Sequence, residues 1–579
     1  MLDFDICYRA MASRDARFDG AFYVAVTSTG VYCRPVCGSR TPKRENVRFF
    51  RVGAAAEAAG FRACRRCRPE AGPSSPEWNV RGDLVARALR LIASGAVDEA
   101  GVAGVARQLA VSERHLHRQL VAEVGVGPLA LALNRRAQTA RLLIEAGALP
   151  LADVALAAGY SSIRQFNDGI RTAFGRSPSE LRGARTPHDG RRAQRSGPLT
   201  LRLRYRPPLN GTALVTWLRD RAVPGVEEVD GDRYRRTLRL PRGSGVAELD
   251  LNSATSGGRD PVPEVRLRLS LDDLRDITAA VRRCRDLLDL DADPAAVADA
   301  LGPDPLLGPL VRATPGLRVP GCAEGFELAV RVVVEQYAPL DEVRRLCGRL
   351  AAGYGEPVGP AAVGPAAVGP AAVGPAAAVG AAPEAGPAAE ADPCREAGPA
   401  AGSHPAAGAE PAAGTGSGQA ARPGREGGPG QKTRSPRADS VHDRGAPAPV
   451  AGPTRLFPSA AALAAADLTP LGLGDQPAAA VRALARAVDG GTLRLGRDAD
   501  REEATARLLA LPGIAPWAVQ RIAAHALGDP DAFSPEDPGL RRVAGRTAPA
   551  ELARRARGWR PWRSYAAMHL WSAPSDHTT

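Results

Sequence analysis

The chain has 579 residues and a formal net charge of +13. This length suits about three or four domains, and the charge suits a nucleic-acid partner. A basic protein of the membrane surface is the competing explanation for the charge. However, no apolar run approaches the ~20 residues of a membrane-spanning helix, so we expect no membrane partner.

Four of the nine cysteines stand in two close pairs, Cys33 with Cys37 and Cys64 with Cys67. Two such pairs brought together make a tetrahedral site of four thiolates, which zinc prefers. By spacing alone, a purely structural zinc knuckle is the simplest interpretation. Two disulfides are a weaker alternative, because Met1–Ala12 lacks the basic and apolar segments of a secretory signal. We therefore expect a cytoplasmic protein with bound Zn2+.

The sequence segments that flank these cysteines are a more specific sign of a protein family than the cysteine spacing is. They closely resemble the N-terminal domain of the Ada family, which senses DNA methylation damage, and the resemblance covers nearly all of residues 1–72. The matching segments are Asp19–Val26, Thr29–Pro35, Arg44–Val47 and Ala59–Pro69. The resemblance implies that Cys33 accepts a methyl group from a DNA methylphosphotriester, with all four cysteines as zinc ligands.

This ligand set predicts a binding switch. A thiolate is the nucleophilic form of cysteine, and zinc keeps a cysteine deprotonated at neutral pH. Four thiolates on one Zn2+ carry a formal charge of minus two, and methylation of one sulfur leaves minus one. Because the repulsion from DNA phosphates then falls, the methylated protein should bind DNA more strongly. The attraction is expected from nearby cations, namely Arg34, Lys43, Arg44, Arg48, Arg62, Arg65, Arg66 and Arg68, of which the first three are predicted DNA contacts.

After a Gly-Pro-Ser joint at Ala71–Pro76 the pattern becomes helical. Apolar spacing predicts helices over Asp83–Ser94, Val102–Leu109, Pro128–Ala146, Leu151–Ala158 and Ser162–Phe174. Ser112 is a predicted N-cap for one further helix. Two helix-turn-helix units joined by one helix, with the words Asp153–Ser162 and Phe174–Pro178, resemble the AraC-type DNA-binding domain.

Recognition helices place exposed side chains in the major groove of DNA. We expect such contacts from Arg114, His115 and Arg118 in the first unit. In the second unit we expect them from Ile163, Arg164, Gln165 and Asn167. The apolar Leu116, Leu120 and Phe166 are predicted core residues.

Beyond a basic linker at 185–198, alternating residues predict strands over Leu199–Tyr205, Arg236–Leu240 and Val265–Leu269, with a helix over Thr212–Arg221. Further helices are predicted over Leu271–Leu288, Pro294–Ala300 and Leu306–Ala313. The words Tyr205–Leu209, Val223–Glu227 and Tyr234–Leu238 resemble the small α+β domain that opens AlkA-type DNA-3-methyladenine glycosylases. Gly316–Cys322 continues this resemblance into their helical domain.

Residues 357–453 are rich in Ala, Gly and Pro and contain a tandem Val-Gly-Pro-Ala-Ala repeat. This composition cannot bury a core, so we expect a disordered insertion. Loop-closure entropy grows slowly with length, so the flanking segments can still fold as one domain. Pro393–Arg395 matches part of the active-site word of alkylguanine methyltransferases, but the neighbouring histidine is missing. We therefore expect no second methyl-acceptor domain.

Two later segments, Leu508–Trp517 and Asp529–Arg542, resemble the helix-hairpin-helix and the aspartate-bearing loop of the AlkA-type superfamily. The resemblance implies that backbone amides near Gly513 and Ala515 bind a DNA phosphate. It also implies that Asp537 stabilises the oxocarbenium-like sugar of a flipped nucleotide as the base leaves. A lone aspartate in a polar loop is usually only a turn or cap residue.

This region also departs from the family pattern. Ala515 stands where a second glycine is usual, which would cost about 1 kcal/mol if the backbone there is left-handed. Arg521 and Pro538 hold positions that often carry pocket tyrosines. Tyr337 is the candidate for a residue that wedges into DNA, and Trp517 and Trp571 remain as aromatic faces for an electron-poor alkylated base.

The expected fold is multidomain and mainly α with small α+β parts. The expected divisions are a zinc domain (1–72), a double helix-turn-helix domain (80–184), a linker (185–198), an α+β subdomain (199–312), a helix-hairpin-helix glycosylase domain (313–356 and 454–574) and a disordered insertion (357–453). The predicted function is methylphosphotriester sensing, transcription activation and excision of 3-methyladenine-type purines. We expect a monomer that binds double-stranded DNA and RNA polymerase.

Two other functions stay open. The C-terminal half could bind DNA without catalysis, or the chain could be a zinc-stabilised regulator with no chemistry.

Overall fold

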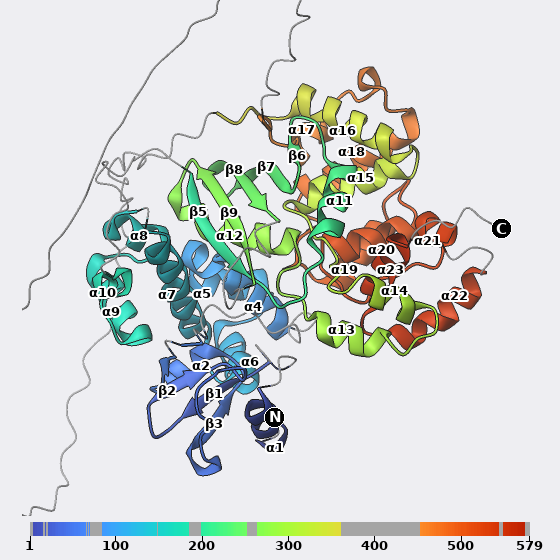
Figure 1. Cartoon of the computed structure of the whole chain (residues 1–579). Helices are drawn as coiled ribbons and strands as arrows, with labels where there is room; N and C mark the ends of the chain where they lie inside the picture. The colour runs from blue at the N-terminus through green and yellow to red at the C-terminus, as the bar shows by residue number, and fades with distance from the viewer. Residues whose placement is uncertain are drawn as a thin grey trace, which may run out of the picture. The chain divides into compact units, whose positions relative to one another are not determined.

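The computed structural model describes residues 4–14, 18, 21–64, 66–67, 69, 84–147, 149–183, 198–251, 263–359, 452–543 and 548–573. The described part of the chain is mainly helical, as the sequence predicts, and it also contains one four-stranded and one five-stranded sheet (Figure 1). The predicted linker, apart from Pro198, and residues 360–451 of the predicted insertion lie outside the described residues. None of the described helices is both long and apolar enough to cross a membrane.

The N-terminal domain is built on a four-stranded sheet that the sequence analysis did not predict. Its strands are β1 (Tyr23–Val26), β2 (Val31–Cys33), β3 (Val47–Phe50) and β4 (Arg62–Ala63), in the order β3-β1-β2-β4. Helix α1 (Phe4–Ser13) contributes buried Cys7 and Met11 to the same core as the buried Phe22. The domain also contains the short helices η2 (Arg44–Asn46) and α2 (Gly53–Ala58).

In the next domain the described residues form seven helices, which include two helix-turn-helix units. They are α4 (Leu84–Ser94), α5 (Ala96–Gln108), α6 (Glu113–Val124), α7 (Pro128–Ala146), α8 (Leu151–Ala157), α9 (Ile163–Phe174) and α10 (Pro178–Arg182). Ser112 caps α6 as predicted, since its hydroxyl accepts a hydrogen bond from the His115 backbone N–H. Helix α5 begins six residues before the predicted start, and Gly101, with a φ of 67°, breaks it into two parts.

A five-stranded antiparallel sheet follows, in the order β5-β9-β8-β7-β6. Its elements are β5 (Leu199–Arg204), α11 (Gly211–Arg221), β6 (Glu227–Asp230), β7 (Arg233–Leu240), β8 (Gly243–Asp250) and β9 (Glu264–Leu271). The three predicted strands are confirmed, whereas β6 and β8 were not predicted. The predicted helix at Leu271 was wrong at its start, because Leu271 pairs with Gly245 as the last residue of β9. The helix α12 spans Ile277–Leu287, after the single turn η5 (Leu274–Asp276).

The remaining described elements are helical. They are α13 (Pro294–Leu301), α14 (Leu307–Ala313), α15 (Gly325–Glu335), α16 (Leu340–Tyr354), α17 (Ala460–Ala464), η6 (Thr469–Leu471), α18 (Asp475–Asp489), α19 (Arg501–Leu509), α20 (Pro516–His525), α21 (Pro538–Val543), α22 (Pro549–Ala556), η7 (Arg557–Trp559) and α23 (Arg563–Trp571). One apolar core includes Val333, Val481 and Ile522, and another includes Trp559 and Leu570. The loop between α20 and α21 therefore connects two packed cores.

The two ends of the predicted insertion meet. Pro357 and Arg455 form an isolated antiparallel bridge, and the Val358 backbone N–H donates to the Thr454 carbonyl at 2.7 Å. Leu350, before the insertion, and Phe457, after it, lie in the same apolar core. The chain therefore leaves and re-enters one core at one place, which lets a long segment be inserted at little cost in loop-closure entropy.

Candidate functional site

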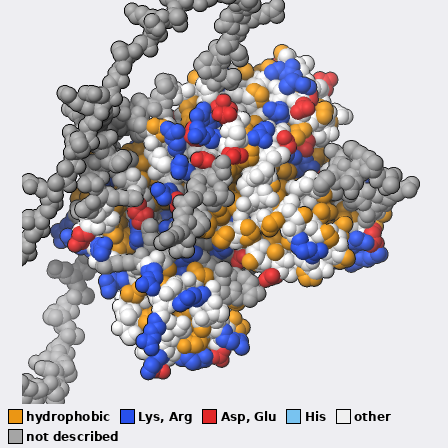
Figure 2. Space-filling view, in the orientation of Figure 1, with side chains coloured by type: hydrophobic (Ala, Val, Ile, Leu, Met, Phe, Trp, Pro, Cys, Tyr) orange, Lys and Arg blue, Asp and Glu red, His pale blue; other side chains and the backbone are white. Residues whose placement is uncertain are grey.

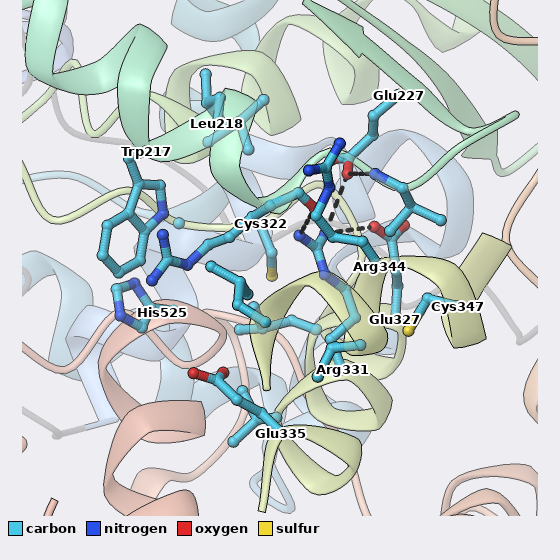
Figure 3. A pocket seen from close by; sticks show the side chains of 18 of the residues that line it. Trp217, Leu218, Glu227, Cys322, Glu327, Arg331, Glu335, Arg344, Cys347 and His525 are labelled. Carbon is cyan, nitrogen blue, oxygen red and sulfur yellow. Dashed lines mark hydrogen bonds and ion pairs between the residues drawn. The ribbon is translucent and has the colours of Figure 1, made fainter. Parts of the chain in front are cut away.

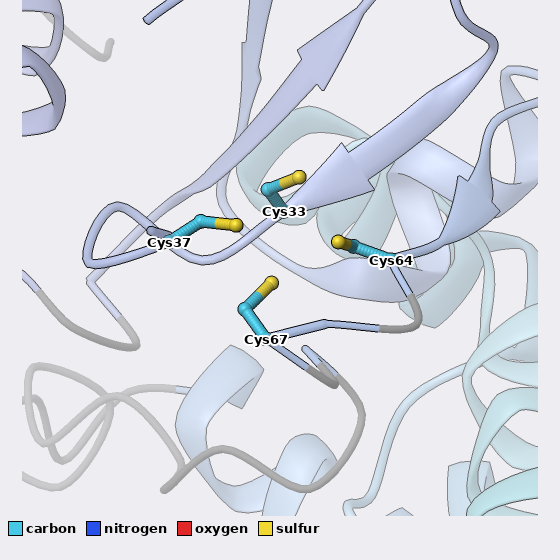
Figure 4. Close-up of side chains that lie close together, drawn as sticks. All are labelled: Cys33, Cys37, Cys64 and Cys67. Atoms are coloured by element: carbon cyan, nitrogen blue, oxygen red, sulfur yellow. The ribbon is translucent and has the colours of Figure 1, made fainter. Parts of the chain in front are cut away.

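The four predicted cysteine ligands converge in the N-terminal domain (Figure 4). Their Sγ atoms all lie within 4.8 Å of one another. Cys33 ends β2, and Cys64 directly follows β4, which pairs with β2 in parallel. The Cys64 backbone N–H donates to the Tyr32 carbonyl at 2.9 Å, which holds the two halves of the cluster together.

This donor set fits zinc. Tetrahedral zinc bonds to sulfur at about 2.3 Å, so four thiolates around one ion lie as close together as these sulfurs do. No described cysteine forms a disulfide. The Arg34 backbone N–H also donates to Cys67 Sγ at 3.3 Å, a hydrogen bond that suits a thiolate ligand. The cluster is a Zn2+ site, and when bound the ion keeps its cysteines deprotonated.

The predicted cations around the cluster are not equivalent. Lys43 is exposed, and its ammonium group lies 3.8 Å from Glu45. Arg44 pairs with Asp5 and stacks on the Tyr8 ring, with 4.8 Å from its guanidinium carbon to the ring centroid. Arg48, Arg62 and Arg66 are exposed, and Arg65 and Arg68 lie outside the described residues. Basic side chains are scattered among uncharged ones over the N-terminal domain in Figure 2, and the exposed Lys43, Arg44, Arg48, Arg62 and Arg66 all belong to the domain that holds the cluster.

The predicted recognition helices are α6 and α9. Leu116, Leu120 and Phe166 are fully buried, as predicted. Their neighbours Arg114, Arg118, Ile163, Arg164 and Gln165 are exposed, while His115 and Asn167 are half-buried. His115 Nδ1 lies 3.1 Å from an Arg118 guanidinium nitrogen, and the Gln165 side-chain oxygen accepts from the Ser161 backbone N–H. The exposed positions leave a polar face on each helix, and their DNA contacts remain predictions.

The predicted hairpin joins α19 to α20. Gly513 has a φ of +80°, and a Cβ there would lie 2.9 Å from the Ala480 Cβ. Ala515 has a φ of −74°. The condition for a cost at Ala515 is therefore not met, and of these two positions Gly513 is the one with the conformation that glycine favours. The Tyr337 hydroxyl donates to the Gly513 carbonyl at 3.0 Å, and Gln336 accepts from the Ala515 backbone N–H at 2.7 Å.

Asp537 is 2 % exposed, and both of its carboxylate oxygens have partners. Its Oδ1 accepts from the backbone N–H groups of Gly539 at 2.8 Å and Leu540 at 3.2 Å, so Asp537 caps α21. The Trp571 Nε1–H donates to the same oxygen at 3.2 Å. A Cβ at position 539 would lie 3.0 Å from that indole nitrogen. Glycine therefore lets the indole approach the carboxylate.

The other carboxylate oxygen of Asp537 is bound by Arg521. The Arg521 Nη2–H donates to Oδ2 at 2.6 Å and its Nε–H at 3.2 Å, while its Nη1–H donates to Glu335 at 2.5 Å. Burial lowers the pKa of Arg521, but the facing Glu335 and Asp537 carboxylates outweigh it, so the pKa is raised. The guanidinium also lies 4.9 Å from the Trp517 ring centroid and 5.2 Å from that of Trp571.

A small cavity of about 50 Å³ adjoins this cluster, and its lining includes Trp217, Glu335, Arg521 and His525 (Figure 3). The His525 ring lies 5.3 Å from the Trp217 ring and 5.9 Å from the Trp571 ring, and the two indoles lie 6.0 Å from each other, so the three ring centroids form a triangle. Burial lowers the pKa of His525 to about 4, so the ring is neutral at neutral pH. Its Nδ1–H then donates to the Pro320 carbonyl at 2.6 Å, and the buried Nε2 has no hydrogen-bond partner among the residues that the structure describes.

Sequence reasoning missed Trp217, Gln336 and His525. Gln336 directly precedes the predicted wedge Tyr337, and this adjacency was an available signal. Trp217 lies on α11, about 300 residues before His525 and outside every quoted motif. Only the packing of α11 near α20 brings these two rings together.

Family models and curated relatives agree with the three resemblances. The model of the metal binding domain of Ada matches residues 6–70, a helix-turn-helix domain matches 105–184, and the AlkA N-terminal domain matches 200–324. The chain is 41 % identical over 575 residues to the probable bifunctional transcriptional activator/DNA repair enzyme AlkA of Mycobacterium tuberculosis, covering 98 % of this chain and 96 % of that protein.

Two further relatives cover separate parts of the chain. The bifunctional transcriptional activator/DNA repair enzyme Ada of Escherichia coli is 37 % identical over 134 residues, which are 23 % of this chain and 36 % of that protein. DNA-3-methyladenine glycosylase 2 of Escherichia coli is 25 % identical over 379 residues, 64 % of this chain and 95 % of that enzyme. Since the Mycobacterium tuberculosis relative matches over nearly its whole length, the chain belongs to the family of bifunctional Ada/AlkA transcriptional activators and DNA repair enzymes.

Proposed function

We propose that this chain is an alkylation-response protein that combines a methyl sensor, a transcription activator and a DNA glycosylase. The sensor function rests on the convergence of four Sγ atoms within 4.8 Å. The sulfur of Cys33 attacks the methyl carbon of a methylphosphotriester and forms a thioether. The methyl–oxygen bond breaks, and its electron pair stays on the phosphate as a phosphodiester anion. Cys33 is not regenerated, so each chain reacts once.

The glycosylase function rests on Asp537, placed between Trp571 and Arg521 at the start of α21. A flipped alkylated purine leaves with the electron pair of its N-glycosidic bond, and the sugar becomes cationic. The negative charge of Asp537 stabilises that cation until water adds to the sugar. The hairpin at Gly513 and Ala515 holds the DNA backbone, and Tyr337 beside it fills the space that the flipped nucleotide leaves.

The helix-turn-helix domain carries the regulatory function. Exposed side chains of α6 and α9 contact promoter DNA, and the methylated zinc domain strengthens that binding. We further propose a monomer that acts in the cytoplasm and contacts RNA polymerase at the promoter. The domain divisions expected from the sequence remain the proposed ones, with zinc domain, regulator and glycosylase in that order.

A second function is favoured by the pairing of Arg521 with Asp537, which leaves the carboxylate buried. In that case the C-terminal region binds DNA without excision. One experiment separates the two functions. Methylated DNA is incubated with the full chain, and protein methylation and free base are scored separately. Free base above the buffer control supports the glycosylase, whereas methyl transfer without free base supports the sensor with a non-catalytic DNA-binding region.

A further inference from the structure

Arg521 contacts Asp537 and the two indoles, Trp517 and Trp571, that are the predicted faces for the base. Its guanidinium donates two hydrogen bonds to Asp537 Oδ2 and lies over the rings of Trp517 and Trp571. A third N–H reaches Glu335 on α15, from the opposite side of the guanidinium. The side chain is only 11 % exposed. Arg521 is therefore anchored in place between two carboxylates.

This placement matters because Asp537 acts through its charge. A carboxylate stabilises a nearby cation less when a guanidinium already pairs with it at hydrogen-bonding distance. The faces of Trp517 and Trp571 attract cations for the same electrostatic reason, and here both face a cation that belongs to the chain. The Oδ1 atom cannot compensate, since two backbone N–H groups and an indole N–H already occupy it.

We propose, on the basis of the excision function above, that Arg521 is the specificity-determining residue of this site: an internal cation that competes with cationic nucleotides for Asp537 and the two indole faces. While the guanidinium is in place, a positively charged base or sugar gains less over a neutral one than it would beside an unpaired carboxylate. The chain's preference for cationic ligands is thereby set by residue 521. Removing the guanidinium charge should therefore raise the affinity for cationic ligands relative to neutral ones.

A binding experiment tests this without requiring catalysis. Two matched duplexes carry one abasic analogue each, either a pyrrolidine, whose ring nitrogen is protonated, or an uncharged tetrahydrofuran. The affinity ratio of the cationic to the neutral duplex is measured at one salt concentration for the full-length wild type, Arg521→Gln and Arg521→Lys. We expect the ratio to rise about tenfold or more in Arg521→Gln, since removal of a paired charge shifts such equilibria by at least that factor. Arg521→Lys keeps the charge and should stay near the wild-type ratio.

Two controls make the result specific. Arg507→Gln removes an arginine that pairs with Glu503 on α19, and it should leave the ratio unchanged. Because Arg521→Gln leaves two carboxylates facing each other, the double variant Arg521→Gln with Glu335→Gln is measured as well, with thermal unfolding as the check on its fold. The double variant should show the same raised ratio as the single variant. An equal ratio in the wild type and in both variants overturns the proposal.

Release of alkylated bases from methylated DNA is measured in parallel, so that the two proposals fail separately. Faster release by Arg521→Gln than by the wild type supports the role of Arg521. If the wild type releases base while Arg521→Gln is no faster and shows an unchanged affinity ratio, the role of Arg521 is overturned and excision stands. If no variant releases base, excision is overturned, and the affinity ratio alone decides the role of Arg521.

Discussion

The Tyr337 hydroxyl donates a hydrogen bond to the Gly513 carbonyl at 3.0 Å. These residues are far apart in the sequence, yet one was predicted as the DNA wedge and the other as the phosphate-binding glycine of the hairpin. Tyr337 is 42 % exposed, so its ring stands at the surface beside the hairpin. The turn between α15 and α16 and the hairpin before α20 therefore present their side chains as one unit.

The first prediction concerns Tyr337. Tyr337→Phe removes one partly exposed hydrogen bond and should cost about 1 kcal/mol or less of stability. The Gln336 amide still donates to the same carbonyl, at 3.3 Å. Tyr337→Ala also removes the ring, so it should reduce unstacking of a fluorescent base placed opposite an abasic site. Equal unstacking by the Phe and Ala variants would show that the ring is not a wedge.

The second prediction is that Cys33 is the sole methyl acceptor. The protein is incubated with DNA that carries methylphosphotriesters, and the modified peptide is identified by mass spectrometry. The methyl group should appear on Cys33, and the other cluster cysteines of the same sample are the internal control. Cys33→Ser should take up no methyl. Methyl on another cysteine, or on none in zinc-loaded protein, contradicts the assignment.

The third prediction is that methylation strengthens promoter binding. Loss of one negative charge at the zinc site reduces repulsion from phosphates, so the methylated protein should bind more tightly, most clearly at low salt. Affinities of both forms are compared across salt concentrations. Lys43→Gln removes an exposed cation and should lower the salt slope by about one if Lys43 contacts a phosphate. Equal affinities of the two forms at every salt concentration would refute the switch.

The fourth prediction concerns acid stability. Burial, chiefly, with the nearby Arg521 and Arg221, lowers the pKa of His525 from its ordinary 6.5 to about 4. Between pH 6.5 and about pH 4, the unfolded chain therefore binds a proton at His525, whereas the folded chain does not. Stability is fully retained above pH 6.5 and falls as the pH drops toward 4, by about 3 kcal/mol from this group. Urea unfolding of His525→Gln should be less pH-dependent by that amount, and parallel curves for the two proteins would contradict it.

Much of the fold followed from local pattern. Helix α7 spans the predicted Pro128–Ala146, because apolar spacing, an N-terminal proline and a following glycine all agree. The strands of the zinc domain were missed because they contain only two to four residues, too few to show alternation. Strand β8 was missed because Gly243 and Gly245 are not typical strand residues. Pairing with β7 on one side and β9 on the other holds it in the sheet.

The site followed from sequence only in part. The cysteine cluster was predictable because its ligands come in close pairs. The φ angle of Ala515 was not predictable, since the conformation of the whole hairpin determines it. Arg521 was visible as a departure from the family pattern. However, its pairing with Asp537 spans 16 residues and depends on how α20 packs beside the following loop. Tertiary packing, rather than residue type, decides which carboxylate that guanidinium meets.

The last prediction is that Asp537 carries base excision. Asp537→Asn keeps an oxygen that can accept from the Gly539 and Leu540 backbone N–H groups, so the cap of α21 and the fold should survive. The substitution removes the negative charge that stabilises the developing sugar cation. Release of 3-methyladenine or 7-methylguanine should therefore fall on the order of 100- to 1000-fold.

The matched control is Glu536→Gln, which makes the same charge change at the exposed neighbouring residue and should leave base release near the wild-type rate. DNA affinity should persist in both variants, because the hairpin and the basic side chains bind the phosphates. If Asp537→Asn and Glu536→Gln release base equally fast, Asp537 serves only as a helix cap and another group stabilises the cation. If Asp537→Asn alone is slow while its affinity and unfolding temperature are unchanged, the charge of Asp537 is the cause.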